Sequence, residues 1–122
     1  MSKRIEFPLF LTSPLMAGPI VTAAQKALMT NQFGNFEPGA IDGQYGEWAA
    51  RATHRAKFWL GYPDAKTDKA YGSVLHGYLQ GTTTLPAANA KLRAQRQKDR
   101  AAKPMRERAW DLAGADLGER RG

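Results

Sequence analysis

The spacing of apolar residues along the chain predicts three short amphipathic helices within residues 1–81. The first is expected over residues 19–31, where Pro19 suits the opening turn of a helix. Its apolar stripe is Ile20, Ala23, Ala24, Ala27 and Leu28. The second is expected over residues 47–60, with a stripe of Trp48, Ala52, Ala56, Trp59 and Leu60. The third is expected over residues 73–79, with inward-facing Val74, Leu75 and Tyr78. Together these patterns predict an all-α fold.

The flanking segments have weaker patterns. Residues 1–16 predict an extended N-terminal arm, because prolines interrupt an apolar run that is too short for a signal peptide. A compact three-helix domain is expected over residues 17–81. Residues 82–104 consist of good helix formers with a single large apolar residue, Leu92, so we expect a basic helical linker that is marginal as an isolated helix. Residues 105–122 regain the pattern of an amphipathic helix.

The positive charge of the chain is concentrated in the linker. The whole chain carries a net charge of +7, and residues 82–104 hold six basic side chains against Asp99 alone, a net +5. Such a segment attracts any polyanion, including an anionic cell-wall polymer, although it is also typical of a solvated helix face. Because it contains no aromatic residue on which bases stack, nucleic acid is the least favoured partner.

The composition argues against an enzyme. There is no cysteine, and the two histidines, His54 and His76, are too few for an imidazole metal site. We expect His54 to be solvated. The carboxylates Glu37, Asp42 and Glu47 are the candidates for glycoside hydrolysis, but Asp42 and Glu47 have structural roles near a helix start. We therefore expect no catalytic residues, no metal and no cofactor. No apolar stretch approaches the roughly 20 residues of a membrane span.

A short motif occurs twice, at a separation of 26 residues. Asp-Gly-Gln-Tyr-Gly precedes the second expected helix and Asp-Lys-Ala-Tyr-Gly precedes the third. We expect the aspartate to cap the following helix and the tyrosine ring to lie beneath the turn. Gly43 is expected to adopt a positive φ, and Gly46 to allow tight entry into the helix. The motif lacks the further carboxylates of a calcium-binding loop. Its loop-shaping residues are Asp42, Gly43, Tyr45, Gly46, Tyr71 and Gly72.

Residues 9–81 resemble the peptidoglycan-binding domain of three-helix type. The residues that match its pattern in order are Gly18, Val21, Gln25 and Leu28, then Asp42, Gly43, Tyr45 and Gly46, then Tyr71 and Gly72. The run LTSPLMAGP is particularly similar to versions carried by phages of actinobacteria. The chain departs from the family at Ile20, where an acidic residue is usual, and at Phe58-Trp59, where a Phe-Gln pair is common.

The resemblance implies a non-catalytic cell-wall binding module of a phage lysin or of a wall-contacting virion protein. Residues 105–119 are similar to the first helix of the papain-like wall hydrolases that follow such modules, so any hydrolase activity would belong to a catalytic domain absent from this chain. Aromatic faces and planar polar groups recognise glycans, and arginine suits the carboxylates of stem peptides. The expected ligand-binding residues are therefore Arg51, Arg55 and Tyr62.

An alternative is a structural virion protein of a capsid, tail or baseplate. Such a protein would reuse the fold for protein–protein assembly, with its basic tail docked on neighbouring subunits. In either case we expect the protein to be made in the bacterial cytoplasm without a signal peptide. It would then act in the virion or at the host cell wall.

Overall fold

All regular structure in the described part of the chain is helical. The computed structural model describes residues 6–102, apart from the side chain of Ala65. It contains α1 (Pro19–Met29), α2 (Glu47–Trp59), α3 (Ser73–Gln80) and α4 (Ala87–Ala102), with a short 3-10 turn, η1, at Asp64–Lys66. The all-α prediction is confirmed for these residues, and α1, α2 and α3 begin where the sequence predicts them. The amphipathic helix expected over residues 105–122 lies outside the described residues.

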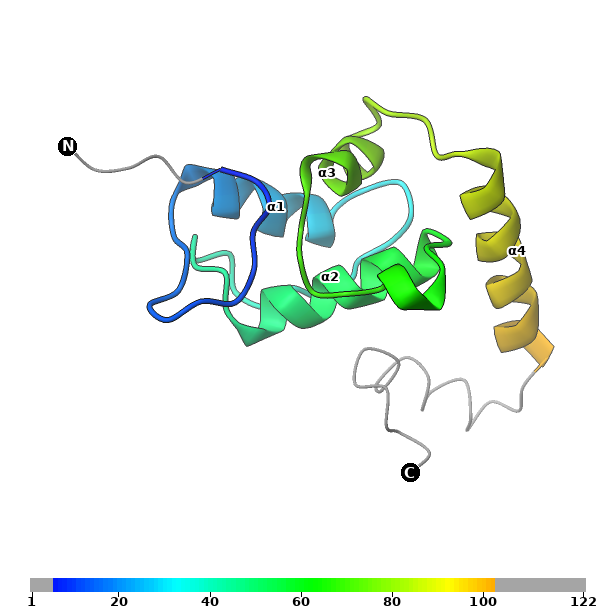
Figure 1. Cartoon of the computed structure of the whole chain (residues 1–122), viewed down its shortest axis with the longest axis horizontal. Helices are drawn as coiled ribbons and strands as arrows, with labels where there is room; N and C mark the ends of the chain where they lie inside the picture. Colours follow the sequence, from blue (N-terminus) through cyan, green and yellow to red (C-terminus); the bar gives the residue numbers. More distant parts are fainter. Residues whose placement is uncertain (1–5, 103–122) are drawn as a thin grey trace.

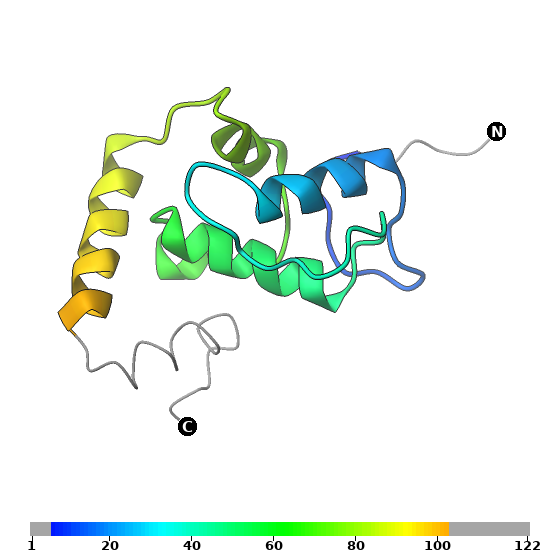
Figure 2. The same cartoon turned by 180° about the vertical axis from the view of Figure 1, so that it is seen from behind.

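The first three helices enclose the core, and α4 stands at one end (Figure 1). Helix α1 contacts both α2 and α3, while α4 contacts α2. The segment between α1 and α2 runs along the length of α2 (Figure 2). The largest fully buried side chains are Tyr45, Tyr71, Leu9, Leu28, Leu60 and Leu75. Leu9 comes from the N-terminal arm, so the arm contributes to the core.

The aspartates of the two copies of the repeated motif make the same backbone hydrogen bond. Asp42 Oδ1 accepts from the N–H of Gln44 at 3.0 Å, and Asp68 Oδ1 accepts from the N–H of Ala70 at 3.1 Å. Each aspartate thus closes a turn with the residue two positions ahead. In both copies the tyrosine ring is fully buried, which confirms the expectation for Tyr45. We call residues 42–46 the first turn motif and residues 68–72 the second.

Both turn motifs bind the N-terminal arm through their backbones. The N–H of Tyr45 donates to the carbonyl of Met16 at 2.8 Å. Tyr71 exchanges two hydrogen bonds with Leu9, of 2.7 and 2.8 Å, in an antiparallel bridge. The repeat is therefore a clamp that holds an extended arm at two points.

Two expectations about the first turn motif are wrong. Gly46 is the N-cap of α2 and no side chain caps the helix, so Asp42 bonds within its own turn instead. Gly46 has a φ of −97°, and an added Cβ would lie 3.5 Å from Leu15, an ordinary contact. Gly43, by contrast, has the expected positive φ of 74°.

Four expectations about side-chain burial are also wrong. Trp48 and Val74, expected in the core, are 61% and 56% exposed. Lys57 lies outside the apolar stripe that the sequence predicts for this helix, so it is expected to be exposed, but it is only 7% exposed. Helix α2 buries a face of small residues, namely Ala49, Ala50, Ala52, Thr53 and Ala56. This face is turned away from Trp48. His54 is partly buried rather than solvated, and its Nδ1 bonds to the carbonyl of Thr67.

Helix α4 packs one side against the end of α2, although most of its residues are exposed. Arg93 donates to the carbonyl of Trp59, and Arg96 donates to the carbonyl of Phe58 at 2.6 Å. Arg96 also pairs with Asp64 at 2.9 Å and is 9% exposed. The guanidinium of Arg100 lies 5.3 Å from the Trp59 ring centroid. Three of the six basic residues of the expected linker therefore face α2 and the turn after it.

Candidate functional site

The most exposed aromatic residue of the described chain lies on the first turn of α2. Trp48 is 61% exposed, although large aromatic residues are usually buried. Its Cβ lies against Gly39 in the segment before the helix, where an added Cβ would come within 3.0 Å of it. Gly39 also has a positive φ of 81°. Glycine therefore suits this position both because of its backbone conformation and because of the close approach of Trp48. The base of the side chain is held in place while the indole ring remains open to solvent.

Arg51 lies one turn further along α2 and covers part of this ring. Its guanidinium carbon is 5.9 Å from the indole centroid, and its Nε is 3.6 Å from Glu47 Oε2. That Nε is buried and has no hydrogen-bond partner within residues 6–102. Glu47 Oε2 also lies 3.4 Å from Lys69 Nζ in the second turn motif. We call Glu47, Trp48, Arg51 and Lys69 the Trp48 platform.

The platform combines one apolar ring face with charged hydrogen-bonding groups. An indole ring offers a flat surface against which an apolar ring face packs. The guanidinium is a rigid fork of N–H donors, and the carboxylate is an acceptor. This combination suits a sugar ring, which has C–H groups on its faces and hydroxyl groups around its edge.

Gln25 orders the loop that leads into α2. It is 2% exposed, and its Nε2 donates to Asp42 Oδ1 at 3.1 Å and to the carbonyl of Gln44 at 3.0 Å. Its Oε1 accepts from the N–H of Gly43 at 2.9 Å. The hydrogen bonds from Gln25 and from the Gln44 backbone lower the pKa of Asp42. The first turn motif is thus fixed by one buried amide from α1.

Tyr45 connects the first turn motif to the second. Its hydroxyl donates to the carbonyl of Lys69 at 2.7 Å and also bonds to Thr53 Oγ1 at 2.6 Å. Burial raises the pKa of Tyr45, so the hydroxyl remains protonated. Lys69 Nζ also lies 3.4 Å from Glu47 Oε2. The hydrogen bond from Tyr45 to the carbonyl of Lys69 therefore holds the backbone of one charged member of the platform next to another.

The structure separates the three expected ligand-binding residues. Arg51 belongs to the Trp48 platform. Arg55 is 9% exposed, and it donates to the carbonyls of Phe36 and Glu37 at 3.1 and 3.3 Å, which holds the preceding segment against α2. Tyr62 lies beyond the opposite end of α2, where its ring packs edge-on to Tyr78. The three residues therefore do not line one groove.

Trp48 is the residue that sequence reasoning missed. Its helical spacing with Ala52, Ala56 and Trp59 predicts a place in the core. The alanine pair at positions 49 and 50 and the buried Thr53 define a different buried face. A helix with so many small buried residues packs closely against its neighbour, and it leaves its bulky residue outside.

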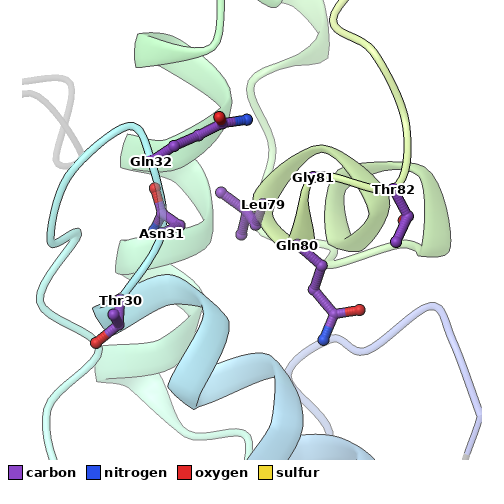
Figure 3. Close-up of a pocket in the computed structure, with 7 residues that line it drawn as sticks. All are labelled: Thr30, Asn31, Gln32, Leu79, Gln80, Gly81 and Thr82. Atoms are coloured by element: carbon purple, nitrogen blue, oxygen red, sulfur yellow. The ribbon is translucent and has the colours of Figure 1, made fainter.

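Two surface hollows within residues 6–102 are lined by residues outside the Trp48 platform. One, of about 530 Å³, lies between the ends of α1 and α3 and is lined by residues 30–32 and 79–82. Asn31, Gln32 and Leu79 extend toward this gap, whereas Thr30 and Gln80 point away (Figure 3). Asn31 Oδ1 accepts from the backbone of Phe33 and Gly34, and its amide donates to the end of α1. It therefore has a structural role here.

The second hollow, of about 390 Å³, lies beside the second turn motif. It is lined by Phe7 and Pro8 of the arm, by Lys57 and Tyr62, and by Ala70 and residues 72–75. Burial, together with neighbouring Tyr78 and Asp68, raises the pKa of Tyr62 to about 12. We call this hollow the Lys57 hollow.

Comparison with known proteins gives no match to a family model, to a curated protein or to a solved structure. Within residues 6–102, no three His, Asp or Glu side chains gather closely enough to hold a metal ion. None of the helices in the same range has both the length and the apolar character needed to cross a membrane.

Proposed function

We propose that this chain is a non-catalytic peptidoglycan-binding module of a phage lysin or of a wall-contacting virion protein. In this proposal the Trp48 platform binds the glycan strand. The observation that carries it is the 61% exposed indole of Trp48 with the Arg51 guanidinium beside it. A pyranose ring would stack on the indole, while Arg51 and Glu47 would bond to its hydroxyl groups.

The hydrogen bonds of Gln25 support this proposal. Gln25, Asp42 and Gly43 are among the residues on which the resemblance to peptidoglycan-binding domains rests, and they bond directly to one another. They order the loop that ends at Gly46, where α2 begins. The residues of the family pattern therefore form the support of the platform.

Co-sedimentation with purified, protein-free sacculi tests the proposal. We expect Trp48→Ala to weaken binding about tenfold, because stacking on an aromatic face is worth up to about 1.5 kcal/mol and about 1.4 kcal/mol corresponds to a factor of ten. Arg51→Ala should weaken binding less. Met29→Ala is the matched control, since it also shortens an exposed apolar side chain, 36% exposed, on a helix. Failure of the wild-type chain to sediment, or equal sedimentation of Trp48→Ala, would contradict the proposal.

A second candidate function, structural assembly in a virion, is supported by the N-terminal arm. Three large apolar residues of the arm, Phe10, Leu11 and Leu15, are 38–45% exposed. Exposed apolar clusters mark protein interaction sites. The docked arginines of α4 give no such support, because they bind the chain's own α2.

Incorporation into assembled phage particles distinguishes this second candidate. Replacing Phe10, Leu11 and Leu15 by serine should abolish incorporation if the arm docks on neighbouring subunits. Sedimentation with sacculi should then be unaffected, since the substitutions leave the Trp48 platform intact. Normal incorporation of the variant would count against the assembly function.

A further inference from the structure

The Lys57 hollow contains a buried cation outside the Trp48 platform. Lys57 belongs to the last turn of α2 and is 7% exposed. Its Nζ lies 5.7 Å from the ring centroid of Tyr62, which lines the same hollow. An ammonium group removed from water requires anionic or π partners. Because Lys57 is one of the residues that line the hollow, its ammonium group is the charge nearest to a ligand bound there.

The present partner of Lys57 is a carboxylate that is itself mostly in water. Lys57 Nζ pairs with Asp68 Oδ1, and the side chain of Asp68 is 63% exposed whereas that of Lys57 is 9% exposed. Asp68 is not among the residues that line the hollow. An ammonium has three N–H donors, so it can bond to Asp68 and to a second carboxylate, or exchange one for the other. The pairing with Asp68 thus shows that Lys57 binds a carboxylate.

The rest of the lining is apolar. The walls of the hollow include Phe7, Pro8, Val74 and Leu75. Of these, Val74 is a large apolar residue with 56% of its surface exposed. A hollow of about 390 Å³ is larger than a carboxylate group alone, so the walls have room for small apolar groups attached to it. The hydroxyl of Tyr62, whose pKa is about 12, stays protonated at neutral pH and is a potential donor.

We propose that the Lys57 hollow binds the C-terminal carboxylate of a short peptide with small apolar side chains. Lys57 supplies the charge, the apolar walls accept methyl groups, and Asp68 competes for the ammonium in the free protein. This inference rests on the proposed function for the source of the ligand, because stem peptides of peptidoglycan carry such carboxylates.

A titration of the full chain with a dipeptide tests the inference. The probe is N-acetyl-alanyl-alanine with a free C-terminal carboxylate, and the control ligand is the same dipeptide as its C-terminal amide. We expect saturable changes in the backbone amide NMR signals of Tyr62 and residues 72–75 with the acid alone. No saturable change in these signals with the acid, or equal changes with the amide, would overturn the inference.

Two pairs of variants separate a direct role of the ion pair from general electrostatics. Lys57→Met should weaken binding of the acid about tenfold, because a charge-assisted hydrogen bond is lost. Asp68→Asn, which can still accept from Ala70, should strengthen binding severalfold by removing the competing carboxylate. Lys91→Met and Asp99→Asn change the same charges on exposed positions of α4, and they should leave the affinity within twofold of the wild type.

The gain in Asp68→Asn keeps the test valid if Lys57→Met fails to fold. Weaker or unchanged binding in a folded Asp68→Asn protein would contradict the competition. Sedimentation with sacculi is an independent readout. Binding of the dipeptide without binding to sacculi would support the site in the Lys57 hollow and contradict the proposed function. Binding to sacculi without binding of the dipeptide would support the proposed function and contradict this site.

Discussion

Single buried polar side chains determine how the loops of this protein are ordered. Gln25 replaces water for three groups of the first turn motif, through both its amide nitrogen and its amide oxygen. A buried polar group that loses its partner incurs a desolvation penalty larger than the net value of the hydrogen bond itself. The amide therefore matters most through the groups that its loss would leave unpaired.

Gln25→Ala tests this role. The substitution would leave the N–H of Gly43 and the carbonyl of Gln44 without their partner, so we expect it to lower the free energy of unfolding by about 2–3 kcal/mol. Urea denaturation followed by circular dichroism measures the change. Gln32→Ala, at an exposed position, is the control and should change stability by less than about 0.5 kcal/mol. Equal stability of the two variants would contradict the role.

His76 makes stability depend on pH. Its Nδ1 bonds to the hydroxyl of Tyr71, its ring centroid lies 5.0 Å from that of Phe7, and burial lowers its pKa below 6.5. The unfolded chain therefore binds a proton before the folded chain does. The stabilising contribution of neutral His76 is complete above the unfolded pKa of 6.5, and it declines as the pH falls from there toward the lower folded pKa.

We accordingly expect the melting temperature to fall between about pH 7.5 and about pH 5.5, before the carboxylates titrate. His76→Asn retains an acceptor for the Tyr71 hydroxyl but does not titrate. This variant should show a smaller fall over the same range, measured by thermal denaturation at each pH. An identical fall in the wild type and the variant would exclude His76 as the cause.

At the scale of elements, α4 completes the end of α2. The last carbonyls of a helix lack partners within it, and they lie at the negative end of the helix dipole. Arg93 and Arg96 donate to the carbonyls of Trp59 and Phe58, and a positive charge is favourable at that end. The backbone of α4 also touches Gly61, since an added Cβ there would lie 1.8 Å from the carbonyl oxygen of Asn89.

Arg96→Ala should therefore destabilise α2 as well as α4. We expect a loss of about 1–3 kcal/mol in the free energy of unfolding, because Arg96 is buried and bonds to both Phe58 and Asp64. Lys98→Ala on the exposed side of α4 is the matched control and should be nearly neutral. Gly61→Ala should disturb the packing of α4 on the end of α2, because the added Cβ would clash with the Asn89 carbonyl. This variant should increase hydrogen exchange along α4. If Arg96→Ala left exchange at the end of α2 unchanged, the capping role would be wrong.

The helices were predictable because their formation depends on local spacing and on residues such as Pro19, which favours the first turn of a helix. Their orientations were less predictable. A stripe of alanines gives little contrast between faces, so the spacing alone predicts a buried Trp48. The docking of α4 depends on contacts over more than 30 residues, such as Arg93 with Trp59, and no short-range pattern encodes them. Of the expected ligand-binding residues, Arg51 joins the candidate site because it lies one turn from Trp48.

At the scale of the whole molecule, the basic segment that stands out in the sequence has fewer exposed charges in the folded protein. The net charge of +7 includes a strongly basic segment, but Arg93, Arg96 and Arg100 face α2 and the turn after it, where they contact carbonyls, aromatic rings and Asp64. The exposed cations of α4 include Lys91 and Lys98. The described surface of this helix is therefore a weaker attractor of polyanions than the sequence suggests.

This arrangement predicts how wall binding responds to salt. Interactions between exposed charges are screened beyond about 10 Å at 0.1 M ionic strength, whereas stacking on Trp48 is much less sensitive to salt. We expect wild-type sedimentation with sacculi to persist as ionic strength rises, and Trp48→Ala to retain only the part that salt removes. The double variant Lys91→Met with Lys98→Met should flatten the salt dependence without abolishing binding. Complete loss of wild-type binding at moderate salt would instead mean that charge alone brings this protein to the wall, and that the exposed indole has another partner.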